Sequence, residues 1–281
     1  MTDLLRYVQD IFVDVLAFFV RKYPATALSW FLARVAMTIR NRNAIRELQL
    51  SKSIKIRCYF ASRYEFNVWL QCEERDDLNL LPNLLGPGEV LVDGGANIGL
   101  WSLLGAEIVG PRGEVHSFEP NPSTFERLKN NVDESKMLWI RTNQMALGEN
   151  LGFISFVCEY EHNNSRSVSA GTAGSIEVPV TSLDAYGKLR KCNLIKIDVE
   201  GLESEIIAGA MNTIREYLPR IIVEYNPMFV GSHRLEDWRV HKLLTELDYS
   251  AQLVSDFGTS TYLRSDWTTK RYCNLVYVNN R

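Results

Sequence analysis

The feature that most constrains the fold is the stretch Glu89–Gly99, which reads E-V-L-V-D-G-G-A-N-I-G. Its apolar run, Val90–Val92, is short and rich in β-branched residues, as in a buried strand. A glycine-rich turn follows Asp93, and residues 100–108 continue with apolar positions at helical spacing. Glycine lets a backbone turn sharply and approach a ligand closely. The stretch therefore predicts the strand, turn and helix that open a nucleotide-binding βαβ unit.

The ligand is indicated by the acid that closes this strand. The pattern is D-x-G-x-N-x-G, with Asn97 where the dinucleotide pattern G-x-G-x-x-G favours glycine. An acid at Asp93 repels a diphosphate but suits the cationic amino-acid end of S-adenosylmethionine. A dinucleotide site and a merely structural turn are the alternatives. The residues predicted to bind the cofactor here are Asp93, Gly94, Gly95, Ala96, Asn97 and Gly99.

Two further strands, at 114–118 and 138–142, are predicted to end in groups that suit the rest of such a cofactor. The polar residues that follow them are Glu119, Asn121, Asn143 and Gln144. The Glu119 carboxylate can accept from two vicinal ribose hydroxyls, unless it is only an exposed strand-end acid. Asn121 is expected to cap the next helix beside the cofactor. The amides of Asn143 and Gln144 are candidates for the adenine edge, which offers both a donor and an acceptor.

A second group of acids follows the strand in Leu194–Gly201, which reads L-I-K-I-D-V-E-G. Ligands bind outside the carboxyl ends of the strands in an open α/β sheet, so these acids should meet Asp93 and Glu119 at one edge. The predicted catalytic residues are Asp198, Glu200, Glu224 and Asn226, and Asp198 is also predicted to bind the cofactor. A carboxylate would accept the proton of a hydroxyl acceptor, while Glu200 has the alternative role of favouring the next helix N-terminus. The three acids are also candidate ligands for a divalent cation such as Mg²⁺, which spacing alone cannot identify.

The first part of the chain, residues 1–60, is predicted to be a helical N-terminal cap, and residues 61–281 the main domain. One face of its first helix is apolar, opposite Asp3, Asp10 and Asp14. The residues on that face are Leu4, Val8, Ile11, Phe12, Val15, Phe18 and Phe19. We expect the cap to pack on the main domain or on a second subunit in a homo-oligomer. Docking on a membrane surface is the alternative, which the acids of the first helix disfavour.

Two more local patterns lie in the cap and between it and the main sheet. A second helix is expected over residues 28–39, and residues 54–60 and 64–70 are expected to pair as a hairpin. Residues 1–57 carry ten Lys or Arg against four acids. The apolar part of the first helix is too short and too charged for a membrane span, and it lacks the pattern of a signal peptide.

The composition of the whole chain argues against several functions. A net charge of −3 gives no support to nucleic-acid binding. Five cysteines without a C-x-x-C pair indicate neither a zinc site nor a disulfide framework. The expected compartment is therefore the reducing cytoplasm, with membrane association through the first helices as the alternative.

In combination, these motifs resemble the FkbM family of S-adenosylmethionine-dependent methyltransferases, over residues 90–226. The motifs are D-G-G-A-N-I-G at 93–99, F-E-P-N-P at 118–122, A-L-G at 146–148, S-L-D at 182–184, K-I-D-V-E-G at 196–201 and I-V-E at 222–224. The resemblance implies an α/β, class I methyltransferase (Rossmann-like) fold with a mostly parallel seven-stranded sheet. Residues 251–255 and 274–278 would close the sheet, and the last strand would be antiparallel.

The resemblance also implies an O-methyltransferase that acts on a hydroxyl of a sugar, a glycan or a small natural product. An NAD-dependent dehydrogenase is a weaker alternative because the chain lacks the dinucleotide glycine spacing. A catalytically silent S-adenosylmethionine-binding module is the alternative outside catalysis. The acids at 198, 200 and 224 count against that alternative.

Overall fold

The computed structural model describes residues 2–23, 26–72, 74–157, 166–168, 172–199, 201–258, 261–264, 267–269 and 272–281. Within these residues the chain divides into two compact units, one ending at Arg75 and one beginning at Asp76. The limits expected from the sequence, 1–60 and 61–281, stay a prediction. No helix among the described residues is long and apolar enough to cross a bilayer.

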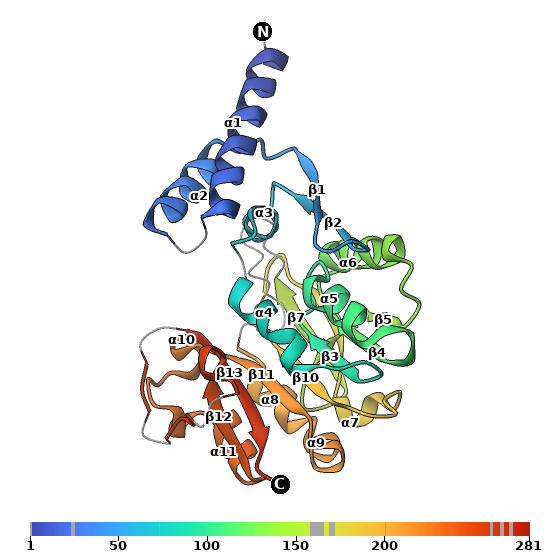
Figure 1. The fold of residues 1–281 in the computed structure, drawn as a ribbon. Helices are drawn as coiled ribbons and strands as arrows, with labels where there is room; N and C mark the ends of the chain where they lie inside the picture. The colour runs from blue at the N-terminus through green and yellow to red at the C-terminus, as the bar shows by residue number, and fades with distance from the viewer. Residues whose placement is uncertain are drawn as a thin grey trace. The chain divides into compact units, whose positions relative to one another are not determined.

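The first unit contains two helices, a two-stranded sheet and a third helix (Figure 1). Its elements are α1 (Thr2–Lys22), α2 (Ala27–Ile39), β1 (Ile45–Gln49), β2 (Lys55–Tyr59) and α3 (Arg63–Leu70). α1 and α2 pack against each other as a helical hairpin. Thr26 begins α2, because its Oγ1 accepts a hydrogen bond from the backbone N–H of Ser29 at 3.1 Å. The two expected helices are confirmed.

The expected pairing of residues 54–60 with 64–70 is wrong. β2 pairs with β1 in an antiparallel register, and the residues after it form α3. Ser62 begins this helix, with its Oγ accepting from the backbone N–H of Glu65 at 3.2 Å. The apolar residues of this segment therefore recur with a helical period and not a strand period. Those buried on α3 are Phe66, Val68, Trp69 and Leu70.

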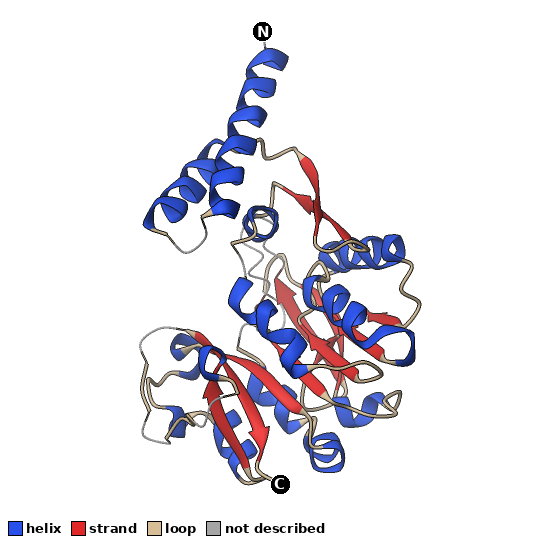
Figure 2. Cartoon of the chain, in the orientation of Figure 1, coloured by secondary structure: helices blue, strands red, loops and turns tan. Residues whose placement is uncertain are grey.

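The second unit is built on a seven-stranded sheet with the order β12-β13-β11-β10-β3-β4-β5. Figure 2 draws the strands in red and the helices in blue. The strands are β3 (Val90–Gly94), β4 (Glu114–Phe118), β5 (Ile140–Asn143), β10 (Leu194–Ile197), β11 (Arg220–Tyr225), β12 (Tyr249–Leu253) and β13 (Cys273–Asn279). Neighbours from β5 to β11 are parallel, whereas β13 is antiparallel to both β11 and β12. The class I methyltransferase fold expected from the sequence is confirmed.

Helices cover both faces of this sheet. On one face, Ser102 of α5 (Leu100–Val109) contacts Asp93 of β3. On the other face, Val92, Ile195 and Val223 share one apolar cluster with side chains of α7, α8, α9 and α11. The remaining helices are α4 (Arg75–Leu84), α6 (Pro122–Ser135), α7 (Leu183–Tyr186), α8 (Glu203–Ala208), α9 (Met211–Tyr217), α10 (Pro227–Val230) and α11 (Arg239–Thr245).

The unit also contains short 3-10 helices and a smaller sheet. The 3-10 helices are η1 (Gly110–Arg112), η2 (Leu235–Asp237) and η3 (Val254–Asp256). The smaller sheet has the order β6-β9-β7-β8. Its strands are β6 (Ala146–Leu147), β7 (Gly152–Val157), β8 (Arg166–Val168) and β9 (Ile176–Thr181). β6 directly follows the turn after β5, so this sheet begins beside the carboxyl edge of the main sheet.

Candidate active site

The carboxyl ends of five neighbouring parallel strands lie along one edge of the main sheet. Asp93 on β3 is in register with Lys196 on β10 and with Ser117 on β4. The predicted acids and amide at this edge are Asp93, Glu119, Asn143, Asp198 and Glu224. Glu119 directly follows β4, Asp198 directly follows β10, and Glu224 lies one residue before the end of β11. The topology thus brings these residues to the edge where open α/β sheets bind ligands.

The glycine turn after β3 is fixed by both of its neighbouring strands. The backbone N–H groups of Gly95 and Ala96 donate to Phe118 O at 3.0 and 2.9 Å, and Asp198 N–H donates to Gly94 O at 3.1 Å. Gly95 has φ +76°, and a Cβ there would lie 2.0 Å from Asp198 O. Only glycine fits such a position, because its backbone is left-handed and another backbone passes beside it. The turn therefore has a defined shape before a ligand binds.

Glu119 lies against this turn and is almost completely buried. Its Oε2 accepts from the backbone N–H of Asn97 at 3.0 Å, and its Oε1 accepts from Asn121 N–H at 2.9 Å. Burial raises the pKa of Glu119 to about 7, and the two backbone donors oppose that rise. Each carboxylate oxygen can accept a second hydrogen bond. Glu119 is thus held in place and retains acceptor capacity.

The predicted amide residues differ in their hydrogen bonds and in their exposure to solvent. Asn121 caps α6, because its Oδ1 accepts from Ser123 N–H at 3.0 Å. Asn143 Nδ2 donates to Ser117 O at 3.1 Å, and its side chain is buried. Gln144 follows β5 directly and is exposed. Gln144 therefore has the amide that is open to solvent, whereas Asn121 and Asn143 have structural contacts. Their contact with a cofactor stays a prediction.

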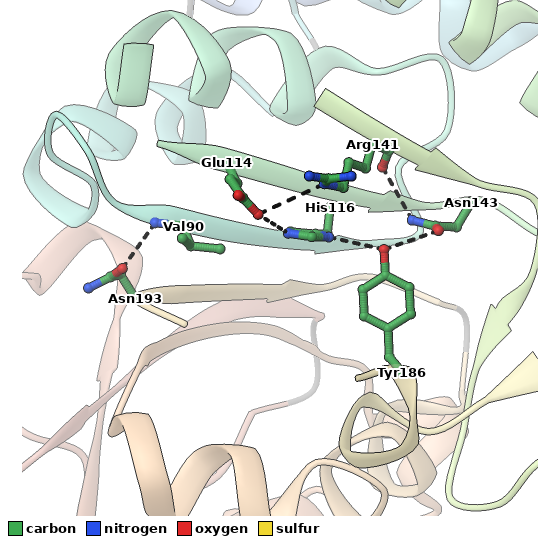
Figure 3. A network of polar contacts seen from close by, with 7 residues as sticks. All are labelled: Val90, Glu114, His116, Arg141, Asn143, Tyr186 and Asn193. Atoms are coloured by element: carbon green, nitrogen blue, oxygen red, sulfur yellow. Dashed lines mark hydrogen bonds and ion pairs between the residues drawn. The ribbon is translucent and has the colours of Figure 1, made fainter. Parts of the chain in front are cut away.

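A network of polar contacts holds Asn143 through Tyr186 of α7 (Figure 3). Tyr186 OH donates to Asn143 Oδ1 at 3.1 Å, and it lies 3.0 Å from His116 Nδ1. His116 Nε2 is 3.0 Å from Glu114 Oε2, and Arg141 is within ion-pair distance of the same carboxylate. Burial lowers the pKa of His116 below its ordinary value. This network of contacts fixes the end of β5, because Tyr186 contacts both Asn143 and His116.

The side chain of Asp93 lies on the face of the sheet that α5 covers. It is fully buried, and its Oδ2 accepts from Ser102 Oγ at 2.6 Å. Ser102 Oγ is in turn 2.7 Å from Ser117 Oγ. Asp93 Oδ1 has no hydrogen-bond donor among the described residues, and the cation near it is Lys196 Nζ at 3.6 Å. The acid that the sequence placed near the cofactor's cationic end is therefore balanced by a buried lysine.

Lys196 is the residue at this edge that the sequence analysis missed. Its side chain is 6% exposed, and its Nζ donates to Gly95 O at 3.0 Å. The same Nζ lies 3.7 Å from Asp198 Oδ2. Lys196 thus connects the glycine turn, Asp93 and Asp198. A lysine within the otherwise apolar L-I-K-I strand was the available signal, because buried lysines are rare unless they are paired.

The predicted catalytic residues lie at two adjacent strand ends. The Asp198 side chain is 38% exposed, so it is accessible to an acceptor. Ile197 is in register with Val223, so Asp198 and Glu224 follow side by side. Asn226 caps α10, with Oδ1 accepting from Met228 N–H at 3.2 Å. Glu200 lies outside the described residues.

Glu203 is a second residue near the site that the sequence motifs did not indicate, and its carboxyl group is close enough to Asp198 for the two charges to interact. It is buried, and its Oε1 accepts from Gly201 N–H at 2.9 Å. Burial raises the pKa of Glu203 to about 7, and the charge of Asp198 contributes to the rise. Two carboxyl groups with raised pKa values, Glu119 and Glu203, therefore flank the site, as is frequent in binding and catalytic clefts.

The predicted metal ligands do not form a complete set in the part of the chain that the structure describes. Among those residues, no group of three or more His, Cys, Asp or Glu side chains could hold a metal ion. Asp198 and Glu224 are described, but the third candidate, Glu200, is not. Binding of Mg²⁺ by these residues stays a prediction.

Comparison with known proteins decides the family. The sequence model of the Methyltransferase FkbM domain matches residues 93–250, which include the glycine turn and the acids at the sheet edge. The chain belongs to the FkbM methyltransferase family. A curated relative is hexuronic acid methyltransferase AglP of Haloferax volcanii. It is 32% identical over 64% of this chain and 72% of its own length.

Other relatives are more distant. Methyltransferase 1 of Beauveria bassiana is 25% identical over 48% of this chain and 63% of its own length. A crystal structure of methyltransferase FkbM from Methylobacillus flagellatus KT is 18% identical. It covers 78% of this chain and 53% of its own chain, with a TM-score of 0.43.

Proposed function

We propose that this FkbM-family methyltransferase transfers a methyl group from S-adenosylmethionine to a hydroxyl oxygen of a sugar or glycan. The observation that carries the proposal is the sheet edge itself, where a rigid glycine turn lies between the carboxyl groups of Glu119 and Asp198. The name of the Haloferax volcanii relative, a hexuronic acid methyltransferase, favours a sugar acceptor over other small molecules.

The residues of the turn fit the cofactor. The left-handed Gly95 lets the turn pass close to the backbone of Asp198, and Glu119 has acceptor capacity for ribose hydroxyls. When bound, the cofactor supplies an electrophilic methyl group on a positively charged sulfur. Lys196 holds the turn through Gly95 O and balances Asp93 behind it. In this proposal Asp93 and Lys196 position the turn and need not touch the cofactor.

The residues beyond the turn fit the acceptor. A sugar hydroxyl is a weak acid, so a positioned base must take its proton during transfer. Asp198 is the proposed base, because its carboxylate is accessible and its backbone is fixed to Gly94 O. Lys196 Nζ holds its Oδ2 from the inner side. Glu224 and Asn226 would orient the acceptor, and Glu200 remains a further candidate base.

Replacing Asp198 tests the proposed base. Asp198→Asn keeps the size of the side chain and removes its basicity. We expect calorimetric affinity for S-adenosylmethionine to be retained and turnover to fall at least about a hundredfold. Asp133→Asn is the matched control, because Asp133 lies on the exposed surface of α6, where it pairs with Lys129. Near-normal turnover in Asp198→Asn would remove this residue from the mechanism.

The chemistry of the product tests the proposed acceptor atom. A hexuronic acid has a carboxylate as well as hydroxyl groups. Methylation of a hydroxyl gives an ether that is stable to alkali, whereas methylation of the carboxylate gives an ester that alkali cleaves. An ionised carboxylate needs no base, so an ester product would go together with an active Asp198→Asn variant. That pair of results would contradict the proposed hydroxyl acceptor.

Two controls separate the remaining alternatives. Chelation should leave turnover unchanged if Asp198 acts as a direct base, whereas loss of turnover on chelation would favour a cation at Asp198, Glu200 and Glu224. Thermal shifts with S-adenosylmethionine and with NAD separate methyl transfer from dehydrogenation. Binding of S-adenosylmethionine without any methylated product across sugar acceptors would favour the silent module.

A further inference from the structure

The first helix of the chain has two apolar faces, and only one of them is covered within the described residues. Val13, Leu16, Ala17 and Val20 are buried within the helical hairpin. On the other side, six large residues recur every three or four positions and are 42–57% exposed. These six are Val8, Ile11, Phe12, Val15, Phe18 and Phe19. They are the residues that the sequence analysis assigned to packing on another part of the protein.

The second helix also has exposed apolar residues. Leu28, Trp30 and Phe31 of α2 are 60–61% exposed. Single exposed apolar residues are ordinary, but six along one face of α1 and three more on the paired α2 are an amount of exposed apolar surface typical of sites that bind a partner or a membrane. We call these nine residues the docking surface. We propose that the docking surface binds an anionic lipid surface, with α1 lying in the plane of the interface.

The charge of the first unit favours lipid over a second copy of the chain. Residues 1–75 carry twelve Lys or Arg against seven acids, whereas the rest of the chain carries 19 against 27. Two copies meeting through their first units would bring like charges together. An anionic leaflet attracts the same basic residues.

The acids of α1 do not oppose this docking. Asp10 forms an ion pair with Arg46 of β1 at 3.5 Å. Asp14 lies close enough to Arg21 for its charge to act on that guanidinium. Both acids are thus balanced by arginines of the same unit. Asp14 comes three residues after Ile11 and four before Phe18, so it borders the exposed apolar residues, and the charge of Arg21 offsets it there.

Residues at the end of the docking surface suit the boundary between headgroups and acyl chains. Lys22 Nζ lies 5.6 Å from the ring centre of Phe18 and 5.5 Å from that of Tyr23. A lysine in this position can keep its charge at the headgroups while its stem covers apolar surface. Tyr23 and Trp30 are exposed, and such amphipathic rings are enriched at membrane interfaces. These residues match a helix that lies on a membrane and does not span it.

Vesicle sedimentation tests the proposal on the full chain. We expect the protein to sediment with vesicles of phosphatidylcholine and phosphatidylglycerol, and much less with phosphatidylcholine alone. The double substitution Phe12→Asp with Phe18→Asp should lower the vesicle-bound fraction at least about tenfold. The matched control is Leu151→Asp with Phe153→Asp, which removes two residues that are 70% and 72% exposed in the second unit. The control should bind vesicles as the parent does.

A second measurement uses the parent fold and so does not depend on the aspartate variant folding. Brominated acyl chains in the vesicles should quench the fluorescence of Trp30, and Trp30→Phe should remove that part of the quenching while vesicle binding persists. No sedimentation of the parent with either vesicle would overturn the proposal. So would a stable dimer that the Phe12→Asp, Phe18→Asp variant dissociates, because a second copy would then occupy the surface.

The proposal for the docking surface and the proposed methyltransferase function can be refuted independently of each other. The docking surface lies in the first unit, and the glycine turn and Glu119 lie in the second. The aspartate variant should therefore keep its calorimetric affinity for S-adenosylmethionine. Loss of vesicle binding together with unchanged cofactor affinity is the expected pair of results.

Discussion

Removal of the buried cation at the sheet edge should destabilise the second unit strongly. Lys196→Met keeps most of the side-chain volume and removes the charge. Asp93 would then lie fully buried with Ser102 as its hydrogen-bond donor but no cation beside it. Gly95 O would also lose the donor that Lys196 Nζ provides.

The size of the effect follows from burial. Asp93 is 0% exposed and the Lys196 side chain 6%, so solvent screens their interaction little. Removing one partner of a buried pair costs about 3–5 kcal/mol in the free energy of unfolding. For a unit of this size each kcal/mol lowers Tm by about 2–4 °C, so we expect a fall of about 6–20 °C.

A double-mutant cycle in urea assigns the effect to the pair. Asp93→Asn removes the charge and keeps an oxygen that can accept from Ser102. In the double variant Asp93→Asn, Lys196→Met no buried charge of the pair remains, so its destabilisation should be smaller than the sum of the singles by about 1–3 kcal/mol. Lys129→Met is the control, since its pair with Asp133 is exposed. Its effect should be within about 0.5 kcal/mol.

Additive single effects would refute the coupling between these two residues. They would mean that Lys196 and Asp93 stabilise the fold independently of each other. An effect of Lys196→Met no larger than that of Lys129→Met would mean that the pair is solvated in solution, and Lys196 could not then be the positioning residue of the turn.

Two further predictions concern the same unit. Gly95→Ala should cost more stability and cofactor affinity than Gly88→Ala, because both have positive φ but only a Cβ at Gly95 meets another backbone, at 2.0 Å; equal effects on urea unfolding and calorimetry would remove the close approach as the cause. Burial keeps the pKa of folded His116 below its unfolded value of 6.5, so unfolded chains bind more protons as pH falls through that value and the free energy of unfolding falls with it. His116→Gln should make this acid dependence shallower, and an unchanged slope in urea titrations would assign it to other groups.

Local patterns predicted the part of the site that depends on local backbone. The strand, glycine turn and helix over residues 89–109 follow from the spacing of apolar residues and glycines alone. The N-cap at Asn121 likewise depends only on Pro122 and the residues after it. The mostly parallel seven-stranded sheet with an antiparallel last strand came with the family resemblance, and the order of its strands came from the structure, since sequence spacing cannot show which strands pair.

Contacts between segments that are distant in the chain could not be predicted from the sequence. Lys196 gains its role from Asp93 and Gly95, about a hundred residues away, and nothing near it in the chain shows that pairing. The S-L-D motif has a similar explanation. Asp184 accepts from Thr213 N–H at 2.8 Å and so holds the start of α9, a structural role that its own neighbours do not indicate.

The first helix shows a different limit of prediction from sequence patterns. Its helical period identified an apolar face correctly, but a period cannot say what covers that face. The structure shows that the residues packed against α2 and α3 come from a second face, that of Val13 and Val20. Segment 64–70 failed for the opposite reason, because a short apolar run fits a strand or a helix until its N-cap, Ser62, is considered.

Calorimetric titration of S-adenosylmethionine across neutral pH tests the central claim most directly. Burial raises the pKa of Glu119 to about 7, and its two backbone donors together with two ribose hydroxyls need the full acceptor capacity of the ionised carboxylate. Affinity of the parent should therefore rise as pH increases through about 7. Glu119→Gln should bind about ten- to a hundredfold more weakly at higher pH, with a flatter pH dependence, whereas Glu126→Gln on the exposed side of α6 should match the parent. Equal affinity of the parent and Glu119→Gln at every pH, or no binding by the parent, would contradict a cofactor site at this edge of the sheet.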